Sequence, residues 1–341
     1  MRCSSFARRY LALVRPLSIA AVLIIAATMV STVHAGIVTF GSGLNQFTME
    51  FVTIGSPGNA PDTTGVPNPA GAVAYEYGIG KFEVSRDMIT KFNASQSLQV
   101  GLDDMTSFGG NGANRPATGV TWNGAARFVN WLNTSTGNQA AYKFTTGSLD
   151  DNIALWAPGD VGYDPSNPYR NSSAKYFLPT SDEWYKAAYY NPTDSTYYDY
   201  ANGSNTAPTS VASGTGAGGA VYFQPFFQGP ADVTQAGGLS PYGVMGLGGN
   251  VDEWEESSTD RLNSSGSSSR GLRGGAWFAN ANALSSSYRN DNGPGSGASM
   301  LGFRVVTVSS PAPAAVPEPS TLLIGTLVGL GGYIGKRRLK K

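Results

Sequence analysis

One glycine-rich stretch near the end of the chain constrains its fold more than any other. Residues 242–254 read YGVMGLGGNVDEW, and two short echoes follow, RGGAW at 273–277 and GFRV at 302–305. Glycine adopts positive φ angles and lets backbone segments approach one another closely. This mixture of glycines, large aromatic residues and single charges predicts a folded loop core rather than a regular helix or strand.

The same stretch permits two interpretations. Main-chain carbonyls together with Glu253, and with Asp252 nearby, are the kind of oxygen ligands that a hard cation such as calcium prefers. The alternative is a tight turn in which Trp254 is buried and both carboxylates are solvated. The residues alone favour the turn, and both interpretations stay open at this point.

The first 35 residues resemble a secretory signal. A basic start is followed by the mostly apolar run 17–33, and Val33-His34-Ala35 forms a small-x-small cleavage site before Gly36. A retained membrane anchor is the alternative, and the cleavage site argues against it. We therefore expect residues 1–35 to be a signal peptide.

The other end also carries a signal. The sequence VPEPS at 316–320 precedes an apolar run at 321–335 and a basic tail at 336–341. This order resembles the PEP-CTERM sorting signal of Gram-negative bacteria. The resemblance implies processing by an exosortase-type peptidase, export, transient membrane retention through this segment alone, and release to the cell surface or extracellular matrix. The apolar run is shorter than the roughly 20 residues that a membrane-spanning helix needs.

Residues 36–310 remain for a single folded domain. The full chain has 23 basic and 23 acidic residues, but the two ends hold nine of the basic residues and one of the acidic ones. The domain therefore carries 14 basic and 22 acidic residues, a net charge of −8. This balance argues against nucleic acid as a partner and is compatible with cation binding.

The cysteine and histidine positions exclude whole classes of chemistry. The chain has one cysteine, Cys3, and one histidine, His34, and both lie in the expected signal peptide. Disulfides, cysteine–histidine and serine–histidine–aspartate catalysis, and zinc sites built on histidine are excluded from the domain. Any catalysis there must use Asp, Glu, Lys, Tyr or Ser.

Local patterns predict an α+β domain with few helices, short strands and much irregular structure. Residues 47–54 and 72–84 are typical of strands. Ser85 is expected to cap a helix to about Ala94, Thr121 a helix over 122–132, and the capping box of Thr180 and Glu183 a helix to about Tyr190. Three polar, glycine-rich segments are predicted to be surface loops within one domain: 201–220, 257–271 and 290–299.

Six motifs in order resemble the formylglycine-generating enzyme family, also called sulfatase-modifying factor domains. The motifs are YGIGKFEVSRDMITKF at 77–92, RPATGVTWNGAARFVNWLN at 115–133, YFLPTSDEWYKAAYY at 176–190, YGVMGLGGNVDEWEES at 242–257, RGGAW and GFRV. The resemblance runs over most of 47–306. It implies a compact, calcium-binding variant of the C-type-lectin-like fold.

One departure from the family bears directly on activity. The oxidase members use a redox-active cysteine pair after the RGG motif and bind copper through it. The corresponding positions here are Ala279 and either Leu284 or Ser285, none of which supplies a thiolate for copper. The iron-dependent relatives take histidine ligands from a separate helical domain. We expect this chain to have neither that domain nor a histidine that could act as a ligand. Formylglycine generation is therefore expected to be absent.

The resemblance also implies where calcium would bind. The family's GNVWEW loop corresponds here to Gly249, Asn250, Val251 and Glu253, with Asp252 in place of the usual tryptophan. A second, looser correspondence in the loop after the third helix gives Asn202 and Asn205. The resemblance moves the balance at Glu253 toward calcium.

The arginines and aromatic residues of the closing motifs have two interpretations. Arg273, Arg289 and Arg304 could read a ligand, but arginines beside glycine in a compact loop fold more often pair with buried carboxylates. We expect that structural role for all three. The aromatic residues Trp254, Trp277 and Phe303 are predicted core residues, with a sugar-binding groove near Trp277 and Tyr288 as the alternative.

The leading functional hypothesis is a binding or structural module. Such a protein would be exported and surface- or matrix-associated, and would contact exopolysaccharide or another cell-surface glycan. The first alternative is an enzyme of the formylglycine-generating or non-haem iron family. The second is a carboxylate-dependent hydrolase that uses acids from the cluster Asp252, Glu253, Glu255 and Glu256.

Overall fold

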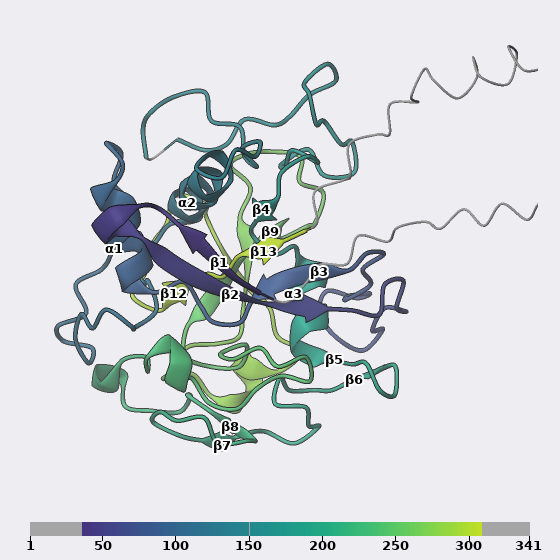
Figure 1. The fold of residues 1–341 in the computed structure, drawn as a ribbon. Coiled ribbons are helices and arrows are strands. Elements are labelled where there is room, and N and C mark those ends of the chain that lie inside the picture. The colour runs from purple at the N-terminus through teal and green to yellow at the C-terminus, as the bar shows by residue number, and fades with distance from the viewer. Residues whose placement is uncertain (1–35, 150, 309–341) are drawn as a thin grey trace, which may run out of the picture. The chain divides into compact units, whose positions relative to one another are not determined.

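The computed structural model describes residues 36–149 and 151–308. The predicted signal peptide, the predicted sorting signal and its apolar segment lie outside these residues. Within them the chain forms three α-helices and thirteen short strands joined by long irregular segments (Figure 1). No helix in this part of the chain is long and apolar enough to cross a membrane. The mixed, helix-poor architecture confirms the predicted α+β class.

A five-stranded antiparallel sheet forms one part of the domain. Its strand order is β1 (Gly36–Phe40), β2 (Phe47–Ile54), β3 (Tyr77–Gly80), β13 (Val306–Thr307) and β4 (Tyr176–Phe177). In β2 the apolar residues Phe47, Met49 and Phe51 are buried in alternation with more exposed residues, because side chains of a strand point alternately to its two faces. Of the strand predicted over 72–84, only β3 forms. The residues on either side of β3 within that range are not part of a strand.

The three predicted helices all form, and each begins at the predicted cap. Ser85 caps α1 (Arg86–Ala94), Thr121 caps α2 (Trp122–Thr134), and Thr180 with Glu183 forms the full capping box of α3 (Ser181–Tyr189). A side-chain oxygen at each cap accepts a backbone N–H that the first helical turn leaves unpaired.

A four-stranded sheet holds the closing motifs. Its order is β11 (Asn290–Asn292), β10 (Arg270–Arg273), β9 (Asp252–Ser258) and β12 (Leu301–Gly302). All seven residues of β9 are buried. The loop prediction holds up to Val251 and is wrong beyond it, because the acids that suggested an exposed edge lie in a strand that is covered on both faces. The predicted loops at 257–271 and 290–299 are likewise partly strand.

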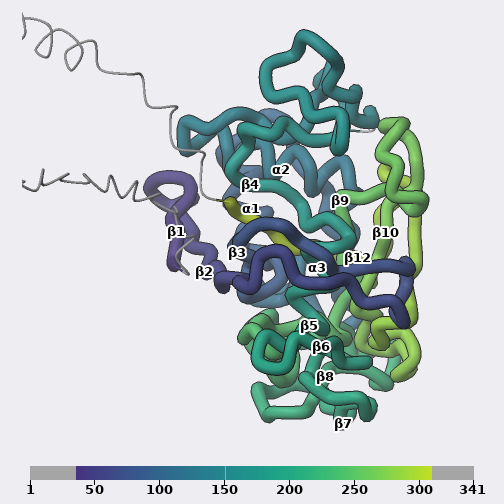
Figure 2. Tube along the Cα trace, turned by 90° about the vertical axis from the view of Figure 1, so that its right-hand side faces the viewer, coloured from purple at the N-terminus to yellow at the C-terminus, as the bar shows by residue number. Residues whose placement is uncertain are grey.

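Two short pairs of strands complete the domain, β5 (Tyr190–Asn191) with β6 (Thr196–Tyr197) and β7 (Thr209–Ser210) with β8 (Gly219–Ala220). Figures 1 and 2 both place α2 at one end of the described domain and β7 and β8 at the other. Four tryptophans, Trp122, Trp184, Trp254 and Trp277, are among the largest fully buried side chains. The predicted core roles of Trp254, Trp277 and Phe303 are confirmed.

Candidate functional site

The predicted metal loop is a tightly bonded turn that leads into β9. Gly249 has a φ of 86°, and a Cβ there would lie 2.3 Å from the carbonyl oxygen of Val221, so the position requires glycine. Asn250 also has a positive φ, of 65°. Its backbone N–H donates to the Val221 carbonyl at 2.8 Å, and its own carbonyl accepts the Trp277 N–H at 3.0 Å. These bonds fix the backbone of the loop against the RGG segment.

The Glu253 carboxylate is the counterion of Arg304. The Arg304 Nε atom donates to Glu253 Oε2 at 2.6 Å, its Nη2 donates to Oε1 at 2.5 Å, and the Trp184 indole N–H donates to Oε2 at 2.7 Å. Both partners of the ion pair are fully buried. Because both oxygens already accept bonds from a bidentate guanidinium, this carboxylate would have to share its charge with any bound cation.

A residue that sequence reasoning missed, Glu83, joins the same loop. Its Oε2 accepts a bond from the Asn250 side-chain amide at 2.7 Å, whereas its Oε1 is buried and has no hydrogen-bond partner among the described residues. Burial raises the pKa of Glu83 well above its usual range, and the charge of Glu253 raises it further. A single acid inside the apolar segment Phe82-Glu83-Val84 was the signal that could have identified it.

The orphaned oxygen is the structural observation that bears on a cation. Buried polar atoms nearly always have partners, and a carboxylate oxygen without one suits a calcium ion. The Glu83 carboxylate lies against Gly246 and accepts the hydrogen bond from the Asn250 side chain, which places it beside the predicted loop. No group of three or more Asp, Glu, His or Cys side chains gathers within 36–149 and 151–308. Any calcium here would rely on Glu83 together with main-chain oxygens, and the calcium site stays a prediction.

The second predicted calcium loop has one comparable feature. Asn202 Oδ1 is buried and has no hydrogen-bond partner in the described part of the chain. Asn205 Oδ1 instead accepts the Asp199 N–H at 3.1 Å. The structure therefore leaves Asn202 available and engages Asn205 in its own loop.

The remaining acids of β9 also point inward. Glu255 is fully buried between two arginines: Arg273 Nε lies 2.8 Å from its Oε1, and Arg289 Nη2 lies 2.7 Å from its Oε2. Together with the Glu253–Arg304 pair, these contacts confirm the structural role predicted for the three arginines. Glu256 accepts a hydrogen bond from the Tyr142 hydroxyl at 2.8 Å.

The expectation that Asp252 and Glu253 are solvated is wrong. Asp252 is 7% exposed, and its Oδ1 accepts the Gly275 N–H at 2.8 Å. Burial raises its pKa to about 6, against the lowering effect of the Gly275 hydrogen bond. The β9 acids are held inside the protein by partners distant in sequence, so they do not form the accessible pair of carboxyls that a hydrolase needs.

The RGG segment carries no thiol. Ala279 is half-buried, and its carbonyl accepts the Phe223 N–H at 2.9 Å; Leu284 is buried and Ser285 is half-buried. Trp277 is fully buried, with its indole N–H donating to the Phe226 carbonyl at 2.9 Å. A sugar-binding groove built on Trp277 is therefore excluded, because its ring is not accessible.

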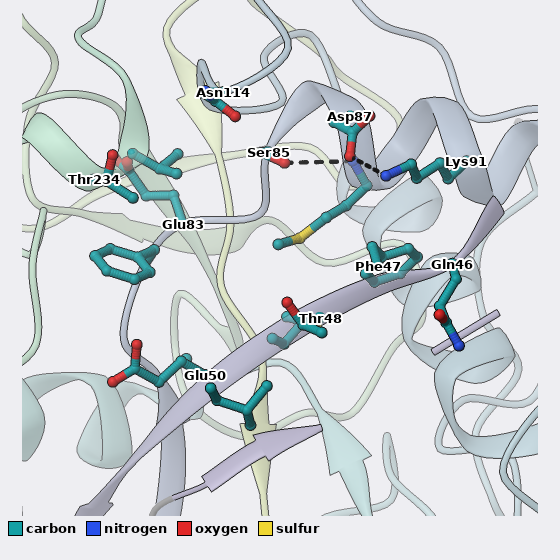
Figure 3. Close-up of a pocket in the computed structure, with 16 residues that line it drawn as sticks. Gln46, Phe47, Thr48, Glu50, Glu83, Ser85, Asp87, Lys91, Asn114 and Thr234 are labelled. Atoms are coloured by element: carbon teal, nitrogen blue, oxygen red, sulfur yellow. Dashed lines mark hydrogen bonds and ion pairs between the residues drawn. The ribbon is translucent and has the colours of Figure 1, made fainter. Parts of the chain in front are cut away.

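Two surface hollows of similar size are built from different side chains. The first, which we name the β2–α1 groove, has a volume of about 480 Å³ and is lined by Glu50, Glu83 and Asp87 among others. Figure 3 shows Glu50 on one side of it and the ion pair of Asp87 and Lys91, 2.7 Å apart, on the other.

The second hollow, which we name the α2 cleft, has a volume of about 460 Å³. It lies between α2 and residues 140–144 and 156, and also contacts the end of α1. Its lining includes Arg127, Trp131, Lys143, Phe144 and Trp156. The sequence analysis identified neither hollow, since both combine segments that are far apart along the chain.

The fold and the closing motifs define a sulfatase-modifying factor domain. The family model described as the sulfatase-modifying factor enzyme 1-like domain matches residues 27–308, and the chain belongs to this family. The predicted C-type-lectin-like fold of that family is thereby confirmed. No curated protein sequence matches the chain significantly.

Solved structures share this fold at low identity. The match to Treponema denticola variable protein 1 has a TM-score of 0.54 and 21% identity, and it covers 81% of this chain and 99% of that chain. The match to the structure of CarF has a TM-score of 0.55 and 21% identity, and covers 76% of this chain and 98% of that chain. Likeness at this level shows the fold alone.

Proposed function

We propose that this protein is a non-catalytic binding or structural module of the sulfatase-modifying factor family. The observation that carries the proposal is the RGG segment, where Ala279, Leu284 and Ser285 stand at or near the positions of the oxidases' cysteine pair. The described chain contains no cysteine and no histidine to substitute for it. Thiolate-based copper chemistry therefore has no ligands here.

The setting of the proposed module is outside the cell. The leader-like residues 1–35 and the PEP-CTERM-like residues 311–341 support export, processing by an exosortase-type peptidase, and release to the surface or matrix of a Gram-negative bacterium. In that setting the partners would be exopolysaccharide or another cell-surface glycan. The net negative domain is a poor partner for nucleic acid.

Calcium is the cofactor that we propose for the module. Gly249, Asn250, Val251 and Glu253 would form its loop, and Glu83 would contribute the oxygen that has no other partner. The ion would have a structural role, because it would neutralise the buried Glu83 carboxylate and tie the β3–α1 connection to the β9 loop.

The hydrolase alternative gains no support. Glu253 and Glu255 are each neutralised by buried arginines, and Glu256 is engaged by Tyr142. The alternative that the experiment must address is an enzyme of the formylglycine-generating or non-haem iron family.

The test is an aldehyde assay on a sulfatase-type cysteine peptide, with the full-length chain and added copper. We expect no aldehyde above a boiled control, and a cysteine-containing oxidase of the family should give signal under the same conditions. Turnover by this chain would overturn the non-catalytic proposal. Elemental analysis of the same preparation, purified without added metal or chelator, should find calcium.

A further inference from the structure

We propose that the α2 cleft binds an acidic polysaccharide, with sugar rings against its tryptophans and sugar carboxylates beside Arg127 and Lys143. This inference rests on the proposed binding function and names its site and ligand class. It is carried by the combination of partly exposed aromatic rings, two cations and the lack of carboxylates among the lining residues that the structure describes.

The aromatic walls of the cleft are fixed in place. Trp131 packs against Phe92 with a centroid distance of 5.5 Å and against Phe47 at 5.9 Å, so one part of its ring is held in the core. Trp156 is held from the other side, because its indole N–H donates to the Ala141 carbonyl at 3.0 Å. Both rings are only partly buried and line the hollow.

Such rings suit sugars for a physical reason. A pyranose ring presents a face of C–H groups that is apolar and a rim of hydroxyls that is polar. Rigid aromatic rings cover the apolar face at small entropic cost, while nearby polar groups bind the rim. In the α2 cleft the exposed hydroxyl of Thr134 and the amide of Gln96 supply such polar groups.

The charges of the cleft select acidic sugars. The guanidinium of Arg127 lies 3.8 Å from the centroid of Phe144, its Nη2 donates to the Ser148 carbonyl, and its Nε is buried without a hydrogen-bond partner in the described residues. No carboxylate in that part of the chain forms an ion pair with it, although the charge of Asp151 is near enough to oppose the pKa lowering that burial causes. Arg127 is therefore a partly exposed cation that has no ion-pair partner among the described residues.

Lys143 is the second cation. Its Nζ lies 2.8 Å from Asp160 Oδ2 and 5.7 Å from the centroid of Trp156, and its side chain is 33% exposed. It thus covers only part of the Trp156 ring and leaves the rest of the ring for a sugar, and part of its own surface is free. A carboxylate on a stacked sugar would meet Lys143 from the solvent side.

The β2–α1 groove shows that the charge pattern is local. That groove has a similar volume, but its lining includes Glu50, Glu83 and Asp87, whereas the lining residues of the α2 cleft that the structure describes include no acid. On a domain with a net charge of −8, a cleft with two cations and no acid among its described lining residues should repel an acidic polymer less than the β2–α1 groove does.

The test is calorimetric titration of the full-length chain with a hexamer of galacturonate, alongside a neutral β-linked glucose hexamer of the same length. We expect the acidic hexamer to bind at least about tenfold more tightly at low salt, with the preference shrinking as salt screens the charges. Equal affinity for both hexamers would overturn the acidic specificity. Failure of the acidic hexamer to bind at all would overturn the site.

Variants locate the binding. Arg127→Gln and Trp156→Ala should each weaken binding of the galacturonate hexamer about tenfold, since each removes one main contact. Because Trp156→Ala removes the hydrogen bond to the Ala141 carbonyl and can disturb the backbone there, Lys143→Gln is the surface variant, with an expected loss of about fivefold. Its matched control is Lys91→Gln in the β2–α1 groove, another lysine that pairs with a single aspartate.

The control decides the location. Unchanged binding in Lys143→Gln together with a loss in Lys91→Gln would place the ligand elsewhere and overturn the inference. The aldehyde assay is independent of these titrations. Aldehyde production would contradict the non-catalytic function without affecting the titrations, and failed titrations would remove the glycan cleft while leaving the non-catalytic function standing.

Discussion

Two sets of buried acids lie close together in this protein and differ in their partners. Glu253 and Glu255, which we call the paired acids, each meet arginine at 2.5–2.9 Å. Glu83 and Asp252, the unpaired acids, form no ion pair among the described residues and have raised pKa values. The difference teaches that burial alone does not make a functional acid: the paired acids serve the fold, and the unpaired acids mark where a cation or a proton can bind.

The largest effect should come from breaking a paired acid. Arg304→Ala would leave Glu253 as an uncompensated buried charge, which typically costs about 3–5 kcal/mol of stability. Urea unfolding monitored by tryptophan fluorescence measures it. Arg289→Ala is the matched control, because Glu255 keeps Arg273 as a partner, and its loss should be clearly smaller. Equal losses would mean that the pairing does not separate these acids.

The effect of calcium on stability should depend on the unpaired acid Glu83. At a calcium concentration about 100 times its dissociation constant, binding to the folded state alone would add about 2.7 kcal/mol to stability. A chelator should therefore lower the melting temperature of the natural chain, and Glu83→Gln should remove that response. If neither calcium nor a chelator changes the melting temperature of the natural chain, the proposed site is contradicted.

The other unpaired acid predicts a pH dependence. The pKa of Asp252 rises on folding from 3.8 to about 6, so the folded state favours the protonated acid. The stability that the protonated Asp252 contributes to the folded state is fully present below pH 3.8 and is lost as pH rises through 6. Asp252→Asn keeps the acceptor for the Gly275 N–H and should gain about 2 kcal/mol at pH 7.5.

The gain from Asp252→Asn should nearly vanish at pH 4, where the natural residue is largely protonated in the folded protein. Urea unfolding of both proteins at pH 4, 5 and 7.5 gives their free energies of unfolding. Because Glu83 and Glu256 titrate in both proteins, their contributions cancel when one free energy is subtracted from the other. A gain that is the same at every pH would show that ionisation of Asp252 is not its cause.

The smallest effect belongs to an exposed ion pair. Lys91 and Asp87 lie 2.7 Å apart on α1, with side chains that are 28% and 39% exposed. Lys91→Gln should change stability by less than about 0.5 kcal/mol, because solvent screens the pair. A change comparable to that of Arg304→Ala would break the distinction between buried and exposed pairs in this protein.

Local features of the fold were predictable, and features that depend on distant contacts were not. Ser85, Thr121 and Thr180 mark helix starts because a cap acts within three residues of itself. One of the two interpretations of the sequence left Asp252 and Glu253 solvated, because charged residues usually are. Their actual burial depends on Arg304, 51 residues after Glu253, which the local pattern cannot reveal.

The candidate sites divide in the same way. The sequence identified the loop from Gly249 to Glu253 through its glycines, yet it missed Glu83, which is 167 residues away from Asn250 along the chain. It also left open a groove near Trp277 and Tyr288 as the alternative to a core role for Trp277, and the fold buries the Trp277 ring. The α2 cleft joins α2 to a segment without a motif of its own, so no pattern pointed to it.

The sequence by itself determined the family, the helix starts and the absence of thiol and imidazole chemistry from the domain. These follow from residue identity and short spacing, which folding does not alter. Tertiary structure alone decided which acids are neutralised by arginine, which retain an unsatisfied oxygen, and which of two similar hollows has no carboxylate among its described lining residues. Each of these depends on side chains that only long-range packing brings within a few ångströms, where burial strengthens every electrostatic interaction.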